Sequence, residues 1–159
     1  MKKRTAALFV FNGYEDWGPA LALGLLRSKG NFTIKTFSID GEPVLSAGGL
    51  VVQPSCYLDQ LTAEKIDLLI LPGGDAWQEG QNRELLPLVD EMLWQNKPVA
   101  AIGSATLLTG TTGDNIITAQ GSAMVEFAVA IAAATGCMEE EKLLEWAEPY
   151  QYSANILSE

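Results

Sequence analysis

Residues 97–106 read Lys-Pro-Val-Ala-Ala-Ile-Gly-Ser-Ala-Thr, an apolar run that stops at a glycine-serine pair. The small or branched apolar residues at 99–102 are typical of a parallel strand that is buried on both faces. Helix-compatible residues resume after Ser104, so the stretch predicts a strand, a tight turn and a helix N-terminus. Open α/β folds place their chemistry at this carboxyl edge of the sheet, where free backbone N–H groups gather. The turn is therefore a candidate site, although Gly103 at its apex offers no side chain.

The rest of the chain continues this alternation of strand and helix without a change in composition. The pattern predicts a single flavodoxin-like, doubly wound α/β domain over residues 1–149, with a mostly parallel sheet and helices on both faces. Pro149 is expected to end the last helix, and residues 150–159 form a polar C-terminal tail. The predicted strands are 5–11, 32–38, 67–71, 99–102 and 115–119, the predicted helices are 19–29, 61–65, 82–95, 123–135 and 139–147, and 44–46 with 50–52 form a small hairpin.

Composition excludes several classes of function. The 159 residues carry a net charge of −10, which disfavours nucleic acid and anionic membranes as partners because both require a positive patch. No apolar run approaches the roughly 20 residues that span a bilayer. The chain has no histidine, so imidazole catalysis is excluded, and we expect neither a metal nor a cofactor. Cys56 and Cys137 have no metal or redox spacing, and two free thiols predict a cytoplasmic protein.

Three glycine-containing turns, at residues 12–18, 72–74 and 103–104, follow predicted strands and should meet at one edge of the sheet. With their surroundings they resemble the PfpI-type family of intracellular proteases and amidases, within the class I glutamine amidotransferase-like superfamily. The resemblance rests on Asp-Trp-Gly-Pro at 16–19, Leu-Ile-Leu-Pro-Gly-Gly-Asp-Ala-Trp at 69–77, Ala-Ala-Ile-Gly-Ser-Ala-Thr at 100–106, Asp-Asn-Ile-Ile-Thr-Ala-Gln-Gly at 114–121, Glu-Phe-Ala at 126–128, and residues 141–146.

This resemblance implies a cysteine nucleophile on a strained strand-to-helix turn, and that position falls on Gly103. The glutamate that tunes the thiol falls on Gly18, so both reactive side chains are replaced by glycine. Gly74 matches the position whose N–H lines the oxyanion hole, with Gly73 beside it and the N–H of Ser104 as a second donor. The resemblance also implies a homodimer.

The histidine that often accompanies the cysteine would lie between the helix after Gly103 and the last strand. Only residues 109–114 connect them here. A strand-loop-helix portion of the family pattern is therefore absent, either because it is deleted or because a disordered segment is missing from the sequence.

Other residues near the turns have two interpretations each. Ser104 is either a helix N-terminal serine that bonds backbone groups or a substitute nucleophile that would need a lysine or a carboxylate as its base. Glu15 and Asp16 are the nearest acids, and we interpret them as charges in the first turn of a helix. Trp17 and Trp77 either line the pocket or belong to the core.

We therefore expect a PfpI-like domain that is catalytically disabled and acts as a binding or scaffold protein, or is an engineered variant. A small molecule in the glycine-lined pocket is the expected ligand, with no nucleic acid and no membrane as partners. The alternative is an active hydrolase, amidase, or glyoxalase- or deglycase-like enzyme that uses Ser104 or another group.

Overall fold

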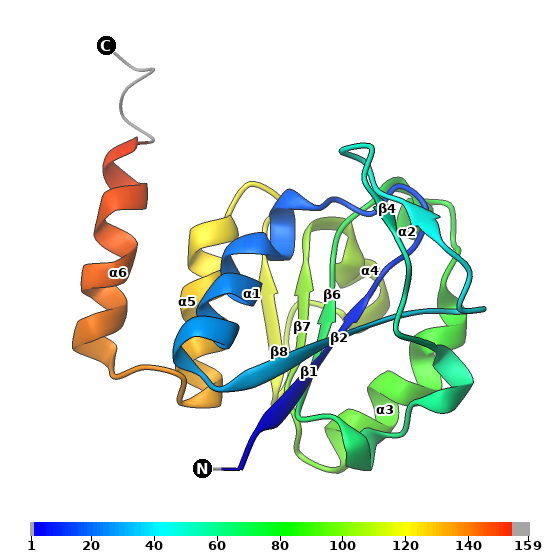
Figure 1. The fold of residues 1–159 in the computed structure, drawn as a ribbon, viewed down its shortest axis with the longest axis horizontal. Coiled ribbons are helices and arrows are strands. Elements are labelled where there is room, and N and C mark those ends of the chain that lie inside the picture. Colours follow the sequence, from blue (N-terminus) through cyan, green and yellow to red (C-terminus); the bar gives the residue numbers. More distant parts are fainter. Residues whose placement is uncertain (1, 154–159) are drawn as a thin grey trace.

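The computed structural model describes residues 2–153 and contains one six-stranded parallel sheet, in the order β5-β2-β1-β6-β7-β8 (Figure 1). A separate antiparallel hairpin joins β3 (Val44–Leu45) to β4 (Val51–Val52). The sheet strands are β1 (Arg4–Phe9), β2 (Phe32–Ser38), β5 (Cys56–Tyr57), β6 (Leu68–Leu71), β7 (Val99–Ile102) and β8 (Ile116–Ala119).

The adjacent inner strands β6 and β7 carry the core, because all eight of their residues are apolar and buried. Neighbouring parallel strands hold them in register, with Ala7 opposite Leu69 and Ile70 opposite Ala100. Parallel strands with both faces covered are apolar along their whole length, which is why the continuous runs identified them in the sequence.

Helices cover both faces of this sheet. α1 (Trp17–Lys29) and α5 (Met124–Thr135) pack against each other on one face, and α3 (Leu86–Trp94) lies on the other (Figure 1). The short helices α2 (Asp75–Gln78) and α4 (Thr106–Thr109) follow β6 and β7, and α6 (Glu140–Ser153) lies outside α5. The predicted flavodoxin-like α/β class is confirmed. Single 3-10 turns occupy Leu58–Gln60, Ala63–Lys65, Arg83–Leu85 and Gly103–Ala105.

The prediction that Pro149 ends the last helix is wrong, because α6 continues through it to Ser153. Residues on both sides hold this turn of the helix: Ala147 is buried, and the rings of Trp146 and Tyr150 lie 5.0 Å apart across the proline. The helix therefore includes the first four residues of the predicted tail, and residues 154–159 lie outside the described part of the chain.

Two elements were not predicted from the sequence, the short strand β5 and the helix α2. Each has four residues or fewer, too few for a hydrophobic period to be recognised. The first strand also ends at Phe9 rather than at residue 11. Over residues 2–153, no helix combines the length and the apolar character needed to cross a membrane.

Gly24 and Gly136 form a matched pair for testing the backbone of these helices. A Cβ on either would meet nothing within 4 Å, but Gly24 is an exposed residue inside α1 whereas Gly136 caps α5 at φ +65°. We expect Gly24→Ala to raise the free energy of unfolding by about 0.5–1 kcal/mol and Gly136→Ala to lower it by about 1 kcal/mol. Urea denaturation measures both, and equal effects in the two variants would contradict the assignment of these backbone conformations.

Candidate functional site

The three predicted turns do meet at the carboxyl ends of β1, β6 and β7. The N–H of Glu15, in the first turn, donates to the carbonyl of Gly73, in the second, at 2.9 Å. A Cβ on Gly103, in the third turn, would lie 4.0 Å from the Cα of Gly73. The backbones of the three turns therefore lie side by side at the edge of the sheet where the sequence placed the site.

Gly103, at the apex of the third turn (the elbow), has a left-handed backbone, with φ +61°. A Cβ built on it would lie 3.3 Å from the Cα of Gly121, in the turn after β8. The hydroxyl of Thr106 donates to the Gly103 carbonyl at 2.8 Å and holds the turn in this conformation. An L side chain at this position is both strained and close to a neighbouring backbone.

Gly18, the predicted position of the acid, lies in the first turn of α1 and is buried. A Cβ there would lie 3.2 Å from Cγ2 of Ile102, the residue before the elbow. Ile102 is only 1% exposed, so its side chain fills the space beside Gly18. A glutamate at this position would require Ile102 to move.

The hydroxyl of Ser104 bonds backbone groups, but those of the second turn rather than of its own helix. It donates to the carbonyl of Gly74 at 2.8 Å and accepts from the N–H of Gly74 at 3.0 Å. Neither a carboxylate nor an ammonium group is among its partners in the described structure. The N–H of Gly74, which the sequence placed in an oxyanion hole, is thus already bonded inside the protein.

A pocket of about 470 Å³ opens beside the elbow. None of its lining residues is ionisable, so the groups available to a ligand are hydroxyls, one carboxamide and the backbone. Trp17 and Trp77 are not part of this lining: Trp17 is 48% exposed, whereas Trp77 is buried and donates its indole N–H to the Pro72 carbonyl at 2.8 Å. The lining consists of Gly103, Thr106, Thr111, Thr118, Ala119, Gln120 and Gly121.

Asp16 attaches the β3–β4 hairpin to the first turn. Its carboxylate accepts hydrogen bonds from the hydroxyl of Ser46 and, at 2.8 Å, from the N–H of Gly48. Burial acts to raise the pKa of Asp16, but these hydrogen bonds outweigh it and lower the pKa below its ordinary value. The predicted role as a first-turn helix charge is wrong, because α1 starts after Asp16 and its first turn contains no acidic residue.

Glu15 also precedes α1, and its carboxylate lies against the second turn. A Cβ on Gly73 would lie 2.9 Å from Oε2 of Glu15. Burial, and after it the charge of Asp75, raises the pKa of the Glu15 carboxyl. Glu15 is therefore a carboxyl with an altered pKa at the edge of the site, which is a feature shared by catalytic acids and bases.

Sequence reasoning missed Ile102, which lies beside Gly18, and the pocket residues Thr106, Thr111, Thr118, Ala119, Gln120 and Gly121. Gly121 had a recognisable signal, because it follows a strand just as Gly103 does. Ile102 had none, since a branched apolar residue at the end of a buried strand gives no indication of what its side chain will contact.

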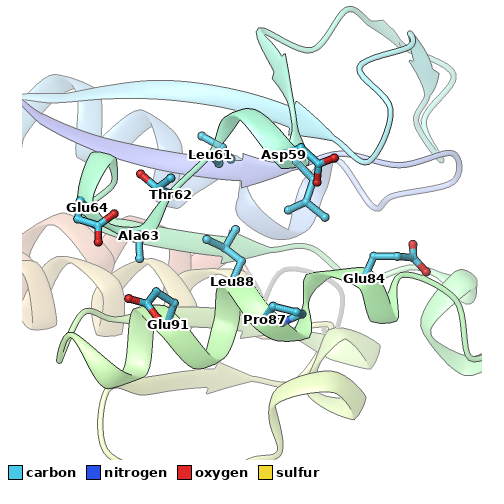
Figure 2. Close-up of a pocket in the computed structure, with 10 residues that line it drawn as sticks. Asp59, Leu61, Thr62, Ala63, Glu64, Glu84, Pro87, Leu88 and Glu91 are labelled. Carbon is cyan, nitrogen blue, oxygen red and sulfur yellow. The ribbon is translucent and has the colours of Figure 1, made fainter.

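A second hollow, of about 510 Å³, lies between the segment 58–64 and α3 (Figure 2). The carboxylates of Asp59, Glu64, Glu84 and Glu91 surround it, and Figure 2 shows the side chain of Leu88 between them. The amide of Gln95 donates to both Glu64 and Glu91, at 3.1 and 2.9 Å. No cysteine, serine or lysine lines it, and residues 2–153 contain no group of three or more His, Cys, Asp or Glu side chains that could hold a metal ion. Its carboxylates are therefore not accompanied by a cysteine or serine nucleophile.

Comparison with known proteins identifies the class to which this fold and site belong. The model of the DJ-1/PfpI family matches residues 4–114. The chain is 26% identical over 189 aligned positions to the uncharacterized protease YoaZ of Bacillus subtilis, covering 92% of this chain and 90% of that protein. Among solved structures, a DJ-1 superfamily protein from Agrobacterium tumefaciens has a TM-score of 0.81 at 29% identity, covering 92% and 99% of the two chains. A ThiJ/PfpI family protein from Bacillus anthracis has a TM-score of 0.82 at 27% identity, covering 92% and 90%.

This chain belongs to the DJ-1/PfpI family. Its alignment with YoaZ is longer than its own 159 residues, so the relative contains residues that have no counterpart in this sequence. In the structure the connection from β7 to β8 consists of the 3-10 turn Gly103–Ala105, α4 and one loop, and the Gly110 N–H caps α4 by donating to the Thr106 carbonyl at 2.8 Å.

Asp16→Ala should lower the free energy of unfolding by about 1–2 kcal/mol at neutral pH, because two hydrogen bonds to a charged, partly buried group are lost. The folded pKa of Asp16 lies below the unfolded one, so its stabilisation is complete above the unfolded pKa and is lost as the pH falls through the folded pKa. Urea denaturation of both proteins should show the difference shrinking between neutral pH and about pH 3.

Asp90→Ala, an exposed position on α3, is the matched control and should change stability by no more than about 0.5 kcal/mol. A difference between Asp16→Ala and the wild type that stays constant across this pH range would contradict the assignment of the hydrogen-bonded, ionised carboxylate.

Proposed function

We propose that this protein is a catalytically inactive member of the DJ-1/PfpI family that binds a small uncharged molecule in the pocket beside Gly103. The observation that carries the proposal is the elbow itself. Gly103 keeps the left-handed backbone expected of the nucleophile position, at φ +61°, and has no side chain to attack a substrate.

The hydroxyl of Ser104 does not supply a replacement nucleophile in this proposal. A serine attacks only when a base removes the proton of its hydroxyl. The Ser104 hydroxyl instead donates a hydrogen bond to the Gly74 carbonyl, at 2.8 Å, and a carbonyl is not such a base. The same pair of hydrogen bonds occupies the N–H of Gly74, a donor that an oxyanion would need.

The lining of the pocket supports an uncharged polar ligand. Thr111 and Gln120 offer a hydroxyl and a carboxamide, and the hydroxyls of Thr106 and Thr118, which donate to the Gly103 and Thr111 carbonyls, can still accept. No charged group of the lining balances an ionic ligand. The net charge of −10 also repels anions, nucleic acid and acidic membrane surfaces. Two free thiols, Cys56 and Cys137, support a reducing, cytoplasmic location.

The rival is an enzyme that uses Ser104 or another group, and the raised pKa of Glu15 is the observation in its favour. A carboxyl of this kind suits a general base, which would activate water rather than a protein nucleophile. The proposal is the same whether the two glycines are natural or engineered, because catalysis depends on the side chains that are present and not on their origin.

The purified chain should show no turnover of peptide anilides, primary amides, methylglyoxal or glycated amines above the buffer rate, with an active family member assayed in parallel. Ser104→Ala and Glu15→Gln should leave this background unchanged, because neither residue acts on a substrate. Turnover by the wild-type chain that falls at least tenfold in either variant would overturn the proposal and identify the group responsible.

We also propose that the protein is a homodimer through a face made by α1 and the β3–β4 hairpin. Trp17, Leu45, Leu50 and Val51 are 48%, 53%, 60% and 75% exposed, a concentration of large apolar side chains unusual for a monomer surface. Asp16, the residue before Trp17, accepts hydrogen bonds from Ser46 and Gly48 of the hairpin, so these side chains lie on neighbouring elements. A twofold axis through such a face would pair it with itself.

Light scattering after gel filtration should give the wild-type chain twice the mass of one subunit. Val51→Asp should reduce it to a monomer, because a charge on this face opposes burial. Trp94→Asp is the control: Trp94 is 84% exposed on α3, away from the proposed face, and its replacement should leave the dimer intact. A monomeric wild type, or a dimer disrupted by Trp94→Asp and not by Val51→Asp, would contradict this interface.

A further inference from the structure

The second hollow, between the segment 58–64 and α3, has the size of a ligand site (Figure 2). Its volume of about 510 Å³ lies within the roughly 300–1,000 Å³ of small-molecule sites. It shares no lining residue with the pocket beside Gly103, and it lies between α3 and the two 3-10 turns that precede β6. A ligand bound here would therefore be independent of the function proposed for the glycine turns.

Apolar side chains form the middle of this hollow. Leu61, Ala63 and Leu88 belong to the hydrophobic core, and Leu58 and Pro87 complete the apolar part of the lining. Figure 2 shows the side chain of Leu88 extending from α3 into the space below the segment 58–64. The central part of a ligand would therefore contact hydrocarbon, which favours a ligand whose own middle is apolar.

The four carboxylates of the lining form two pairs, one at each end of this apolar middle. Figure 2 shows Glu64 and Glu91 at one end of the hollow, with Asp59 and Glu84 toward the other. The Gln95 amide keeps the first pair close together, because it donates to both carboxylates. Glu84 and Glu91 are seven residues apart on one continuous helical segment, which is about two turns or roughly 10 Å along its axis. The hollow is thus negative at both ends and apolar between them.

The charge of these carboxylates is not neutralised from within the described chain. Over residues 2–153, neither a lysine nor an arginine forms an ion pair with any of the four. The ammonium group of Lys97 donates instead to the Ala63 and Ile66 carbonyls, at 2.7 and 3.0 Å. The same residues contain no group of three or more carboxylates close enough to hold a metal ion. The complement to this arrangement is therefore an extended organic cation, with positive charge at both of its ends.

We propose that this hollow binds a linear aliphatic polyamine. The methylene chain of such a ligand lies against Leu61 and Leu88, and its ammonium groups donate to the carboxylate pairs at the two ends. A chain with a single ammonium group reaches one pair and leaves the other without a counter-charge. The pocket beside Gly103 has no ionisable lining residue and does not compete for this ligand.

Titration of the full chain with 1,8-diaminooctane at physiological ionic strength, followed by ¹H–¹⁵N NMR, tests the proposal. The diamine should give saturable shifts of the Gln95 side-chain amide and of backbone amides within residues 58–64 and 84–91. Octylamine, which has the same chain and one ammonium group, should bind at least tenfold more weakly because it engages one carboxylate pair. The absence of saturable shifts with the diamine, or equal binding of octylamine, would overturn the proposal.

Glu84→Gln and Glu91→Gln each remove one charge from one end of the hollow, and each should weaken binding of the diamine at least threefold. Both positions are exposed, so the variants should fold as the wild type does. Asp90→Asn removes the same charge from an exposed position of α3 outside the hollow and should bind the diamine as the wild type does. Equal weakening in all three variants would mean attraction to the net charge alone and would overturn the site. Wild-type affinity in either glutamate variant would also overturn it.

Discussion

The close approach of backbone to backbone at one edge of the sheet is the constraint on which this site depends. A Cβ on Gly74 would lie 2.8 Å from the ring of Phe11 and 3.0 Å from the Gly13 carbonyl, and one on Gly73 would lie 3.3 Å from the Ile102 carbonyl. Only glycine permits such approaches without displacing the neighbouring chain. The turns after β1, β6 and β7 approach this closely because Gly73 and Gly74 have no side chains, and the Ser104 hydroxyl then joins the second turn to the third.

The same contacts leave few polar groups free for chemistry. The Gly74 N–H and the Ser104 hydroxyl satisfy each other, and the Glu15 N–H is bonded to the Gly73 carbonyl. Preorganised donors contribute to catalysis when they are directed at the place where charge develops, and a donor already paired within the protein is not. The hydrogen bonds that stabilise the meeting of the turns thus oppose their use as an oxyanion hole.

The sequence predicts the architecture of this protein better than its contacts. Continuous apolar runs identify β6 and β7 because burial on both faces selects one kind of residue, and Gly73, Gly74 and Gly103 mark the turns that follow. Which groups those turns contact depends on packing between distant segments. Neither the bond from Ser104 to Gly74, nor the position of Ile102 beside Gly18, nor the burial of Trp77 has a signal in local sequence. Pro149 shows the opposite error, in which a strong local rule is overridden by contacts on both sides of the proline.

The two glycines at the predicted catalytic positions are not equivalent. Ile102 fills the space beside Gly18, so apolar packing leaves little room there for a larger side chain or for a ligand. Gly103 borders the pocket formed with Thr106, Gln120 and Gly121, where space remains. In the proposed function, a ligand at the elbow would approach from the β8 side of the sheet, across hydroxyl and carboxamide groups, and would reach Gly103 without contacting Gly18. This geometry favours recognition of an uncharged molecule over activation of a nucleophile, because the pocket that stays open is the one without ionisable groups.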